Sequence, residues 1–137
     1  MCGISGAVGL KDISESLFDC IRNLEYRGYD SCGVALMNGT RLIVQKNVGG
    51  VEDFYRKENV LRHKSKIGIA HTRWATHGGV TQTNTHPFLS CDKKFAVVHN
   101  GIISNYRVLR KQLAKEGHIF HFTTQNKAIW FIGELFN

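Results

Sequence analysis

A single hairpin signal restricts the fold of this chain more than any other feature. Two apolar segments, residues 33–37 and 41–45, flank the dipeptide Asn38-Gly39. Asn-Gly readily takes positive φ at both central positions of a type I′ turn, whose twist matches that of the flanking strands. Strands joined in this way are antiparallel, so the sequence disfavours a doubly wound parallel sheet and predicts a layered α+β sandwich.

Hydrophobic periodicity predicts the other strands and helices. Strands are expected at residues 2–8, 66–71 and 95–99, the last of them buried. Helices are expected at residues 51–62, after Asn100-Gly101 and at residues 128–136. The second of these three carries an apolar stripe that ends at Gly117: Tyr106, Leu109 and Leu113.

The first predicted helix follows the opening strand. Asp12 and Glu15 fit a capping box at its start, and Gly28 lies just beyond its end. Apolar side chains then recur on one helical face, which we expect to be buried: Ile13, Leu17, Cys20, Ile21 and Leu24.

Composition and charge narrow the class of protein. The chain has 137 residues, enough for one globular domain with its own core over residues 1–137. Its formal net charge is +7, but Lys and Arg are not clustered, which argues against a nucleic-acid partner. No apolar run approaches the roughly 18 residues of a membrane helix and no signal peptide begins the chain, so we expect a cytoplasmic protein without membrane contact.

The cysteines and histidines do not form a metal-binding pattern. There is no CxxC pair or short ligand spacing among the four cysteines, which argues against both a disulfide framework and a metal site: Cys2, Cys20, Cys32 and Cys91. His71 and His77 lack the spacing of helical metal ligands. The sequence therefore predicts no metal and no cofactor.

Cys2 stands directly after the initiator methionine. A small residue at this position allows Met1 to be removed, which leaves a cysteine with both a thiol and a free α-amino group. In model peptides an α-amino group titrates at about 7.7 to 8.0 and a thiol at about 8.5, so the amine can act as a base for the thiol. Cys2 is thus a candidate nucleophile, although its position fits a small residue at the start of a buried strand equally well.

Two polar segments could serve such a nucleophile. At Asn100-Gly101 a side-chain amide and a backbone N–H can converge on a developing oxyanion, where one donor commonly contributes about 3 to 4 kcal/mol. Asn-Gly is also a common turn. In the loop after the strand at 66–71, Arg73 could hold a carboxylate in bidentate fashion while Trp74 covers it.

Five motifs together are more specific than any one of them. They are MCGISGAVG, LEYRGYDSCGVAL, GIAHTRWATHGG, the THP of residues 85–87, and VVHNGIISNYRVLR. In this order and spacing, over residues 1 to about 120, the chain resembles the class II, N-terminal-nucleophile glutamine amidotransferases. Within that family it is most similar to the glutaminase domain of glutamine:fructose-6-phosphate aminotransferases. The resemblance implies an αββα four-layer sandwich of antiparallel sheets.

The resemblance also implies a reaction and a site. Cys2 would attack the side-chain amide of glutamine, and its α-amino group would act as base and then as acid. Asn100 and Gly101 would form the oxyanion hole, and Arg27 would support the surroundings of the nucleophile. The α-carboxylate of glutamine would be gripped by four residues: Arg73, Trp74, Thr76 and His77. The products would be glutamate and ammonia, which a sugar-phosphate isomerase domain or subunit would use to make glucosamine 6-phosphate.

The chain departs from the family pattern in two ways. The family has a TDTE motif whose Asp binds the α-ammonium of glutamine, but here Gln125 takes that place and Lys127 replaces the Glu. Because a charge-assisted contact contributes about 1.5 to 3 kcal/mol, we expect weaker glutamine binding. The family's glutaminase domain is also longer and is followed by sugar-isomerase domains. We therefore expect a truncated domain with part of a sheet edge or apolar face exposed, or else a degenerate relative that acts as an interaction or regulatory module.

Overall fold

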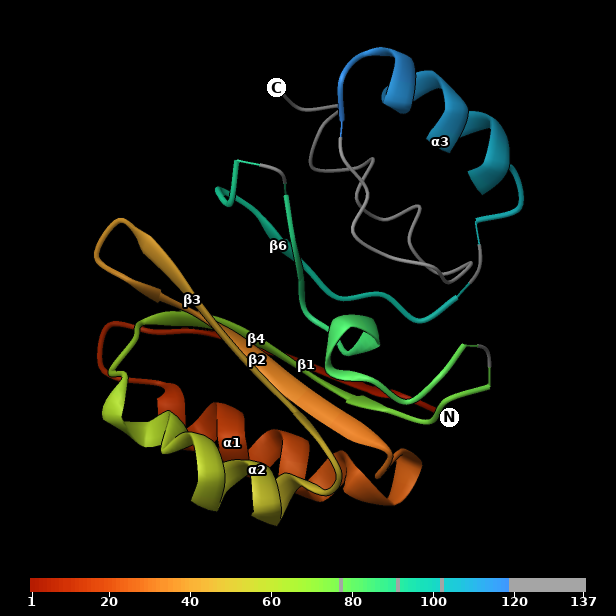
Figure 1. The fold of residues 1–137 in the computed structure, drawn as a ribbon. Coiled ribbons are helices and arrows are strands. Elements are labelled where there is room, and N and C mark those ends of the chain that lie inside the picture. Colours follow the sequence, from red (N-terminus) through yellow and green to blue (C-terminus); the bar gives the residue numbers. More distant parts are fainter. Residues whose placement is uncertain (77, 91, 102, 119–137) are drawn as a thin grey trace.

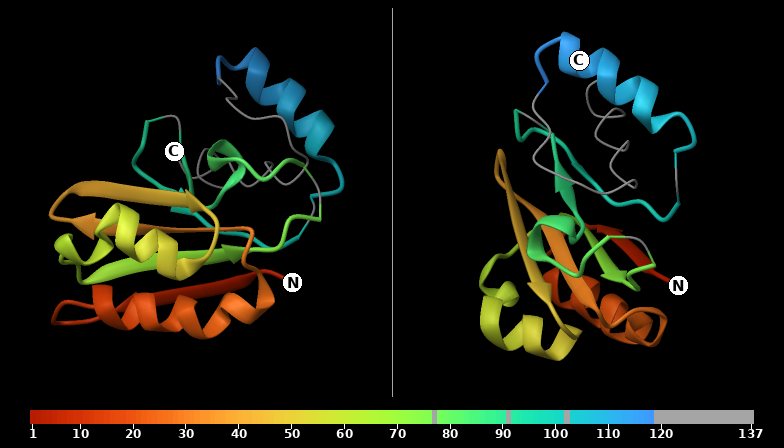
Figure 2. Two further views of the ribbon diagram at one scale, coloured as in Figure 1. Left: turned by 60° about the horizontal axis from the view of Figure 1, so that its bottom comes forward. Right: turned by 45° about the vertical axis from the view of Figure 1, so that its right-hand side comes forward.

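The computed structural model describes residues 1–76, 78–90, 92–101 and 103–118. Helices α1 (Ser14–Leu24) and α2 (Val51–Glu58) form one layer, which covers a four-stranded antiparallel sheet in the order β1-β4-β2-β3 (Figure 1). A two-stranded sheet, β5-β6, lies on the far side, and α3 (Tyr106–Lys115) lies beyond it (Figures 1 and 2). The layers therefore follow the order helix, sheet, sheet, helix, as predicted.

The strands of the large sheet pair with long registers. Their bounds are Gly3–Val8 for β1, Ser31–Asn38 for β2, Arg41–Val48 for β3 and Ile67–Arg73 for β4. The hairpin β2-β3 is confirmed, but Asn38 pairs with Arg41, so the turn consists of residues 39 and 40. It begins at Gly39, with φ +61°. The turn thus lies one residue later than the predicted Asn38-Gly39, because Asn38 completes the ladder.

The core lies between the sheet and the two helices. Val34 and Leu36 of β2 point into it and are 1% exposed. They meet Leu17, Phe18 and Ile21 of α1 and Val51 and Phe54 of α2, all at most 2% exposed. Cys20 was expected on this face but is exposed. The buried face is centred between Leu17 and Phe18, which turns Cys20 toward solvent.

The start of α1 differs from the predicted capping box. The helix begins at Ser14, and the Asp12 carboxylate accepts hydrogen bonds from Ser14 N (3.2 Å), Ser14 Oγ (2.8 Å) and Ser65 N (2.9 Å). The Ser65 N–H in particular holds the pKa of Asp12 below its usual value. Asp12 therefore joins the start of α1 to the segment before β4, and a reciprocal box with Glu15 is not formed.

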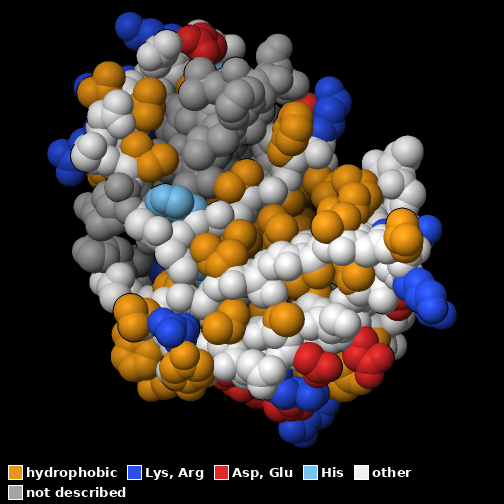
Figure 3. Space-filling view, turned by 180° about the vertical axis from the view of Figure 1, so that it is seen from behind, with side chains coloured by type: hydrophobic (Ala, Val, Ile, Leu, Met, Phe, Trp, Pro, Cys, Tyr) orange, Lys and Arg blue, Asp and Glu red, His pale blue; other side chains and the backbone are white. Residues whose placement is uncertain are grey.

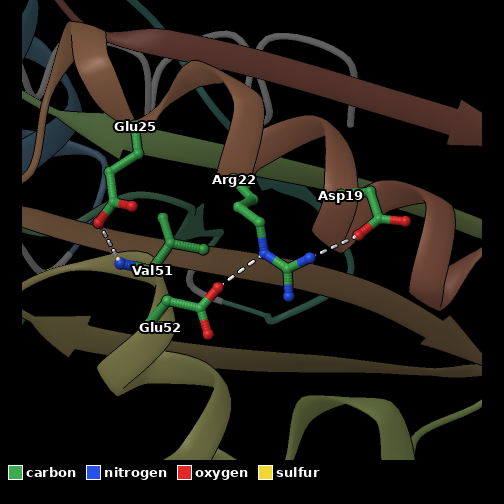
Figure 4. A network of polar contacts seen from close by, with 5 residues as sticks. All are labelled: Asp19, Arg22, Glu25, Val51 and Glu52. Atoms are coloured by element: carbon green, nitrogen blue, oxygen red, sulfur yellow. Dashed lines mark hydrogen bonds and ion pairs between the residues drawn. The ribbon is translucent and has the colours of Figure 1, made fainter.

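Residues at and just after the end of α1 bond to the start of α2 (Figure 4). Glu25, in the 3₁₀ turn η1 (Glu25–Arg27), accepts the N–H of Val51 at 2.7 Å. Arg22 forms ion pairs with Asp19 (3.2 Å) and with Glu52 (2.7 Å). The exposed ion pairs contribute little, whereas the Glu25 carboxylate satisfies an N–H at a helix start, where negative charge is favoured.

The predicted helix at 51–62 is interrupted. Asn59 takes a left-handed conformation, φ 45°, between α2 and the 3₁₀ turn η2 (Val60–Arg62). A left-handed residue cannot continue an α-helix, so the segment folds as two short elements. Val60 of η2 is nevertheless buried in the main core.

The second half of the described chain is less regular. Strand β6 covers only Ala96–Val97, and the predicted buried strand at 95–99 is wrong in this respect because its residues are half-buried or exposed. Its partner β5 (Phe88–Leu89) was not predicted, since two residues carry no periodicity. The third helix is confirmed, with Leu113 buried against Leu109 and Tyr106. The helix expected at 128–136 lies outside the described residues.

The edge strand β1 leaves apolar surface uncovered. Ile4 and Val8 of β1 are 43% and 79% exposed, and Ile67, which pairs with Val8, is 52% exposed. Seen from behind, hydrophobic side chains gather across the middle of the molecule, with charged ones toward its edges (Figure 3). Among the described residues, no helix combines the length and the apolar character needed to cross a bilayer.

Candidate functional site

Cys2 lies where the end of β4 leaves the sheet. Gly3 pairs with Thr72, and its N–H donates to Thr72 Oγ1 at 3.2 Å. The backbone N–H of Trp74 points at Cys2 Sγ at 3.4 Å, and Sγ lies 3.6 Å from the Trp74 carbonyl oxygen. The thiol is half-buried. A sulfur atom held against a backbone N–H is well placed to carry negative charge during a reaction.

Asn100 meets Cys2 from a distant part of the sequence. Its Nδ2 donates to the carbonyl oxygen of Cys2 at 3.0 Å, and its Oδ1 lies 2.8 Å from Nε2 of His71. Gly101 follows with φ +148°, and a Cβ atom there would lie 3.0 Å from the His99 ring. Glycine is therefore required at 101. The predicted proximity of Asn100 to the nucleophile is present, although its amide bonds to the Cys2 backbone.

Two buried histidines lie beside this pair. His71, 1% exposed, stacks on His86 with ring centroids 4.3 Å apart and an interplanar angle of 18°. Burial lowers the pKa of His71 to about 4, assisted by the Arg73 charge and opposed by the bond to Asn100. Burial also lowers the pKa of His86 to about 2, assisted by the neighbouring His71. Both rings are therefore neutral at pH 7.

Arg73 is the last residue of β4, not part of the loop after it as predicted, and its side chain is buried. It is 5% exposed, and its Nη1 and Nη2 donate to the carbonyl oxygens of Gly79 (3.2 Å) and Gly78 (3.4 Å). Burial lowers its pKa, while the nearby Cys2 and Asp30 raise it. A guanidinium remains charged in any protein, so a fixed positive charge stands near the thiol.

The chain around Gly28 and Asp30 supports this loop. A Cβ atom at Gly28 would lie 2.5 Å from the carbonyl carbon of Arg73, so the two backbones are in direct contact. The Asp30 carboxylate accepts the N–H of Ala75 at 2.7 Å, and the Asp30 N–H donates to the Arg73 carbonyl at 3.1 Å. Within this segment only Arg27 was predicted to support the nucleophile, so the contacts of Gly28 and Asp30 were not anticipated. Its quoted motif, RGYDS, was the available signal.

The other predicted site residues lie in varied positions. Trp74 is 41% exposed, with its ring edge-on to Tyr29 at 5.3 Å. Thr76 is exposed in the loop that follows Arg73. Arg27 donates to the hydroxyl of its neighbour Tyr26 at 2.9 Å, and its role toward the nucleophile stays a prediction. His77 and Gln125 lie outside the described residues.

Residues missed as functional candidates are His71 and His86. His86 had been quoted only within a motif, and His71 only within a motif, as the end of a predicted strand and as a rejected metal ligand. The signal that could have found His71 is strand alternation: Ala70 points into the core, so His71 must point to the opposite face, where Gly33 is its register partner. Among the described residues, no group of three His, Cys, Asp or Glu side chains could hold a metal ion.

Solved structures of known proteins share this fold. A glutamine phosphoribosylpyrophosphate amidotransferase from B. subtilis aligns with 93% of this chain and 28% of its own, at a TM-score of 0.77 and 24% identity. A structure titled as the allosteric regulatory enzyme of purine biosynthesis aligns with 88% of this chain and 26% of its own, at a TM-score of 0.76 and 27% identity.

Curated relatives are more similar in sequence. A glutamine–fructose-6-phosphate aminotransferase of Methanococcus maripaludis is 46% identical over 129 residues, which cover 94% of this chain and 21% of the relative. That of Pyrococcus horikoshii is 43% identical over 129 residues, 94% of this chain and 22% of the relative. The chain thus spans about a fifth of the length of the curated relatives that it matches.

The family assignment rests on a further match. Residues 56–131, more than half of the chain, match the family described as glutamine amidotransferase domain. This region includes β4 with Arg73 at its end, the loop that begins at Trp74, and Asn100. The antiparallel fold, which the solved structures share, agrees with that match. The chain therefore belongs to the glutamine amidotransferase domain family.

Proposed function

We propose that this chain hydrolyses the side-chain amide of glutamine to glutamate and ammonia, with Cys2 as the nucleophile. The observation that carries the proposal is the convergence of distant segments on Cys2. The Trp74 N–H lies 3.4 Å from Sγ, and the Asn100 amide lies 3.0 Å from the Cys2 carbonyl oxygen. Membership of the family supports the choice of glutamine.

The reaction proceeds through a thioester. The thiol attacks the side-chain carbonyl carbon of glutamine, and its proton passes to the α-amino group of Cys2, which is free once Met1 has been removed. The Asn100 amide and the Gly101 N–H donate to the oxyanion. The C–N bond then breaks, the amino group returns the proton to the leaving nitrogen, and ammonia departs. Water attacks the thioester, which releases glutamate and restores the thiol.

The substrate's α-carboxylate binds beside Arg73. This guanidinium is buried near Cys2, and the Gly78 and Gly79 carbonyls hold it in place. Trp74, Thr76 and His77 complete that end of the site in this proposal. Gln125 meets the α-ammonium with a neutral amide, so glutamine binds more weakly than it would to an aspartate.

The ammonia serves amino-sugar synthesis in this proposal. The relatives are named as glutamine–fructose-6-phosphate aminotransferases, and this chain spans about a fifth of their length. The acceptor is accordingly fructose 6-phosphate, bound by a sugar-phosphate isomerase domain or subunit, and the product is glucosamine 6-phosphate. The cytoplasmic location stays a prediction of the sequence.

Glutamate release tests the proposal directly. Intact mass first identifies chains that have lost Met1, and glutamate formed from glutamine is then measured. Cys2→Ala should abolish turnover, whereas Cys20→Ala, which alters an exposed cysteine on α1, should not. Gln125→Asp should lower the KM for glutamine. No turnover by a folded chain that lacks Met1 would contradict the proposal and favour an interaction or regulatory module.

A further inference from the structure

The imidazole ring of His71 is buried, stacks on a second histidine and has one hydrogen-bonded nitrogen. The ring is 1% exposed and stacks on His86 at 4.3 Å. Its Nε2 lies 2.8 Å from Oδ1 of Asn100, while its Nδ1 has no hydrogen-bond partner among the described residues. A buried imidazole with one partnered nitrogen acts on that partner, which here is the side chain that bonds to Cys2.

The hydrogen-bond pattern determines where the His71 proton is. The carbonyl oxygen of Cys2 can only accept, so the NH₂ end of Asn100 must face it. The oxygen of the same amide then faces His71, and that oxygen can also only accept. Nε2 of His71 must therefore carry the proton. Burial lowers the pKa of His71 to about 4, so the ring is neutral and Nδ1 is bare.

We propose that His71 is a positioning residue, whose Nε2–H holds the Asn100 side-chain amide with its NH₂ end toward Cys2. Asn100 is exposed, so packing does not select one of its two amide orientations. A flipped amide would turn its oxygen toward the Cys2 carbonyl and toward an oxyanion formed on Cys2. A donor fixed on the other side makes the flipped state unfavourable. The catalytic part of this inference rests on the proposed function.

Three histidine variants separate positioning from packing. His71→Leu keeps the volume similar but removes the donor, and His71→Gln restores a side-chain N–H of similar reach. His63→Leu is the matched control, because His63 precedes β4 at the end of the sheet opposite Cys2. Each variant is first checked for folding by circular dichroism and urea unfolding.

Glutaminase kinetics give the first readout. His71→Leu should lower kcat about tenfold, the effect of one neutral hydrogen bond, with KM for glutamine changed less than twofold. His71→Gln should recover most of the loss, and His63→Leu should resemble the wild type. Alkylation of Cys2 by iodoacetamide should be unchanged in His71→Leu, because alkylation forms no oxyanion. Wild-type kcat in His71→Leu, or no recovery in His71→Gln, would overturn the inference.

Nuclear magnetic resonance gives a readout that does not depend on turnover. Long-range ¹H–¹⁵N spectra, with His71 assigned by its absence in His71→Gln, should show a neutral ring protonated at Nε2 at pH 7. The Nε2 signal should shift in Asn100→Ala. A proton on Nδ1 or a charged ring overturns the inference. If the chain hydrolyses no glutamine, the proposed function fails, and this spectrum alone decides for or against the positioning role.

Discussion

Replacing Gly28 with alanine should disturb Cys2 through the backbone between them. Gly28 is extended, with φ −178°, so alanine adds no conformational strain of its own. Its Cβ atom would lie 2.5 Å from the carbonyl carbon of Arg73 and 2.6 Å from the nitrogen of Trp74. These are backbone atoms, which cannot turn away as a flexible side chain can. The two segments must therefore move apart.

The geometry sets the size of the effect. Non-bonded carbon atoms rest at about 3.5–4.0 Å, so the segments must separate by about 1 Å. Overpacking of this kind lowers the free energy of unfolding by about 1–3 kcal/mol. The Trp74 N–H lies 3.4 Å from Sγ, and a shift of about 1 Å breaks this contact. Without that donor, we expect iodoacetamide to alkylate Cys2 at least about threefold more slowly.

A second glycine provides the matched control. Gly39 has φ +61°, and a Cβ atom at this position would have nothing within 4 Å, so Gly39→Ala brings only conformational strain, about 1 kcal/mol. Urea unfolding and the alkylation rate of Cys2 are measured for both variants. Gly39→Ala should have a lower free energy of unfolding than the wild type, but its Cys2 should be alkylated at the wild-type rate. The reasoning is refuted if Gly28→Ala unfolds within about 0.5 kcal/mol of the wild type and alkylates Cys2 at the wild-type rate.

Three other predictions concern thiol burial, pH and processing. Burial raises the pKa of Cys32 to about 12, so iodoacetamide should modify the exposed Cys20 well before Cys32 in the native protein; equal rates would contradict this. Acid should destabilise the fold, because unfolded histidine protonates at about 6.5 while burial lowers the pKa of His71 to about 4. The contribution of His71 to the free energy of unfolding is fully present above the unfolded pKa of about 6.5. It falls by about 3 kcal/mol as the pH drops from there to the folded pKa of about 4. Urea unfolding at pH 7 and pH 5 should show that the free energy of unfolding drops less in His71→Gln than in the wild type. An equal drop in both proteins would count against the argument. A chain that retains Met1 has a peptide nitrogen in place of the amine, so it should release no glutamate; turnover by protein of that intact mass would show that another base serves Cys2.

Local patterns predicted the parts of the fold that depend on neighbouring residues. The hairpin, the strands that became β1 and β4, and the helix that ends before Gly117 all came from periodicity and turn chemistry. The errors lie where distant residues decide the outcome. Asp12 was expected to form a capping box with Glu15, but its carboxylate accepts the N–H of Ser65. Ser65 is too far along the chain for a local sequence pattern to include it. Strand β5 is two residues long and exists only because β6 pairs with it.

In the candidate site too, local patterns predicted some features and distant residues decided the others. The residue types for a nucleophile and an oxyanion hole, Cys2 and Asn100-Gly101, could be named from their chemistry and their place in the motifs. Their supporting contacts could not, because hydrogen bonds between residues far apart in the chain leave no spacing signal. His71 was quoted as the end of a strand, yet it bonds to Asn100 at 2.8 Å. Asp30 was quoted only within a motif, yet it accepts the N–H of Ala75.

The sequence by itself determined the chemistry available to this protein: a thiol that can become N-terminal, an amide before a glycine and the guanidinium of Arg73. Those identities are covalent facts, and short-range sterics and hydrophobic periodicity place them on particular strands and loops. Only the tertiary structure decided which of them meet. Pairing of β1 with β4 brings Cys2 to Trp74, and the packing of the chain beyond β6 brings Asn100 between Cys2 and His71. Burial then keeps the His71 ring neutral, a property that no residue has in isolation.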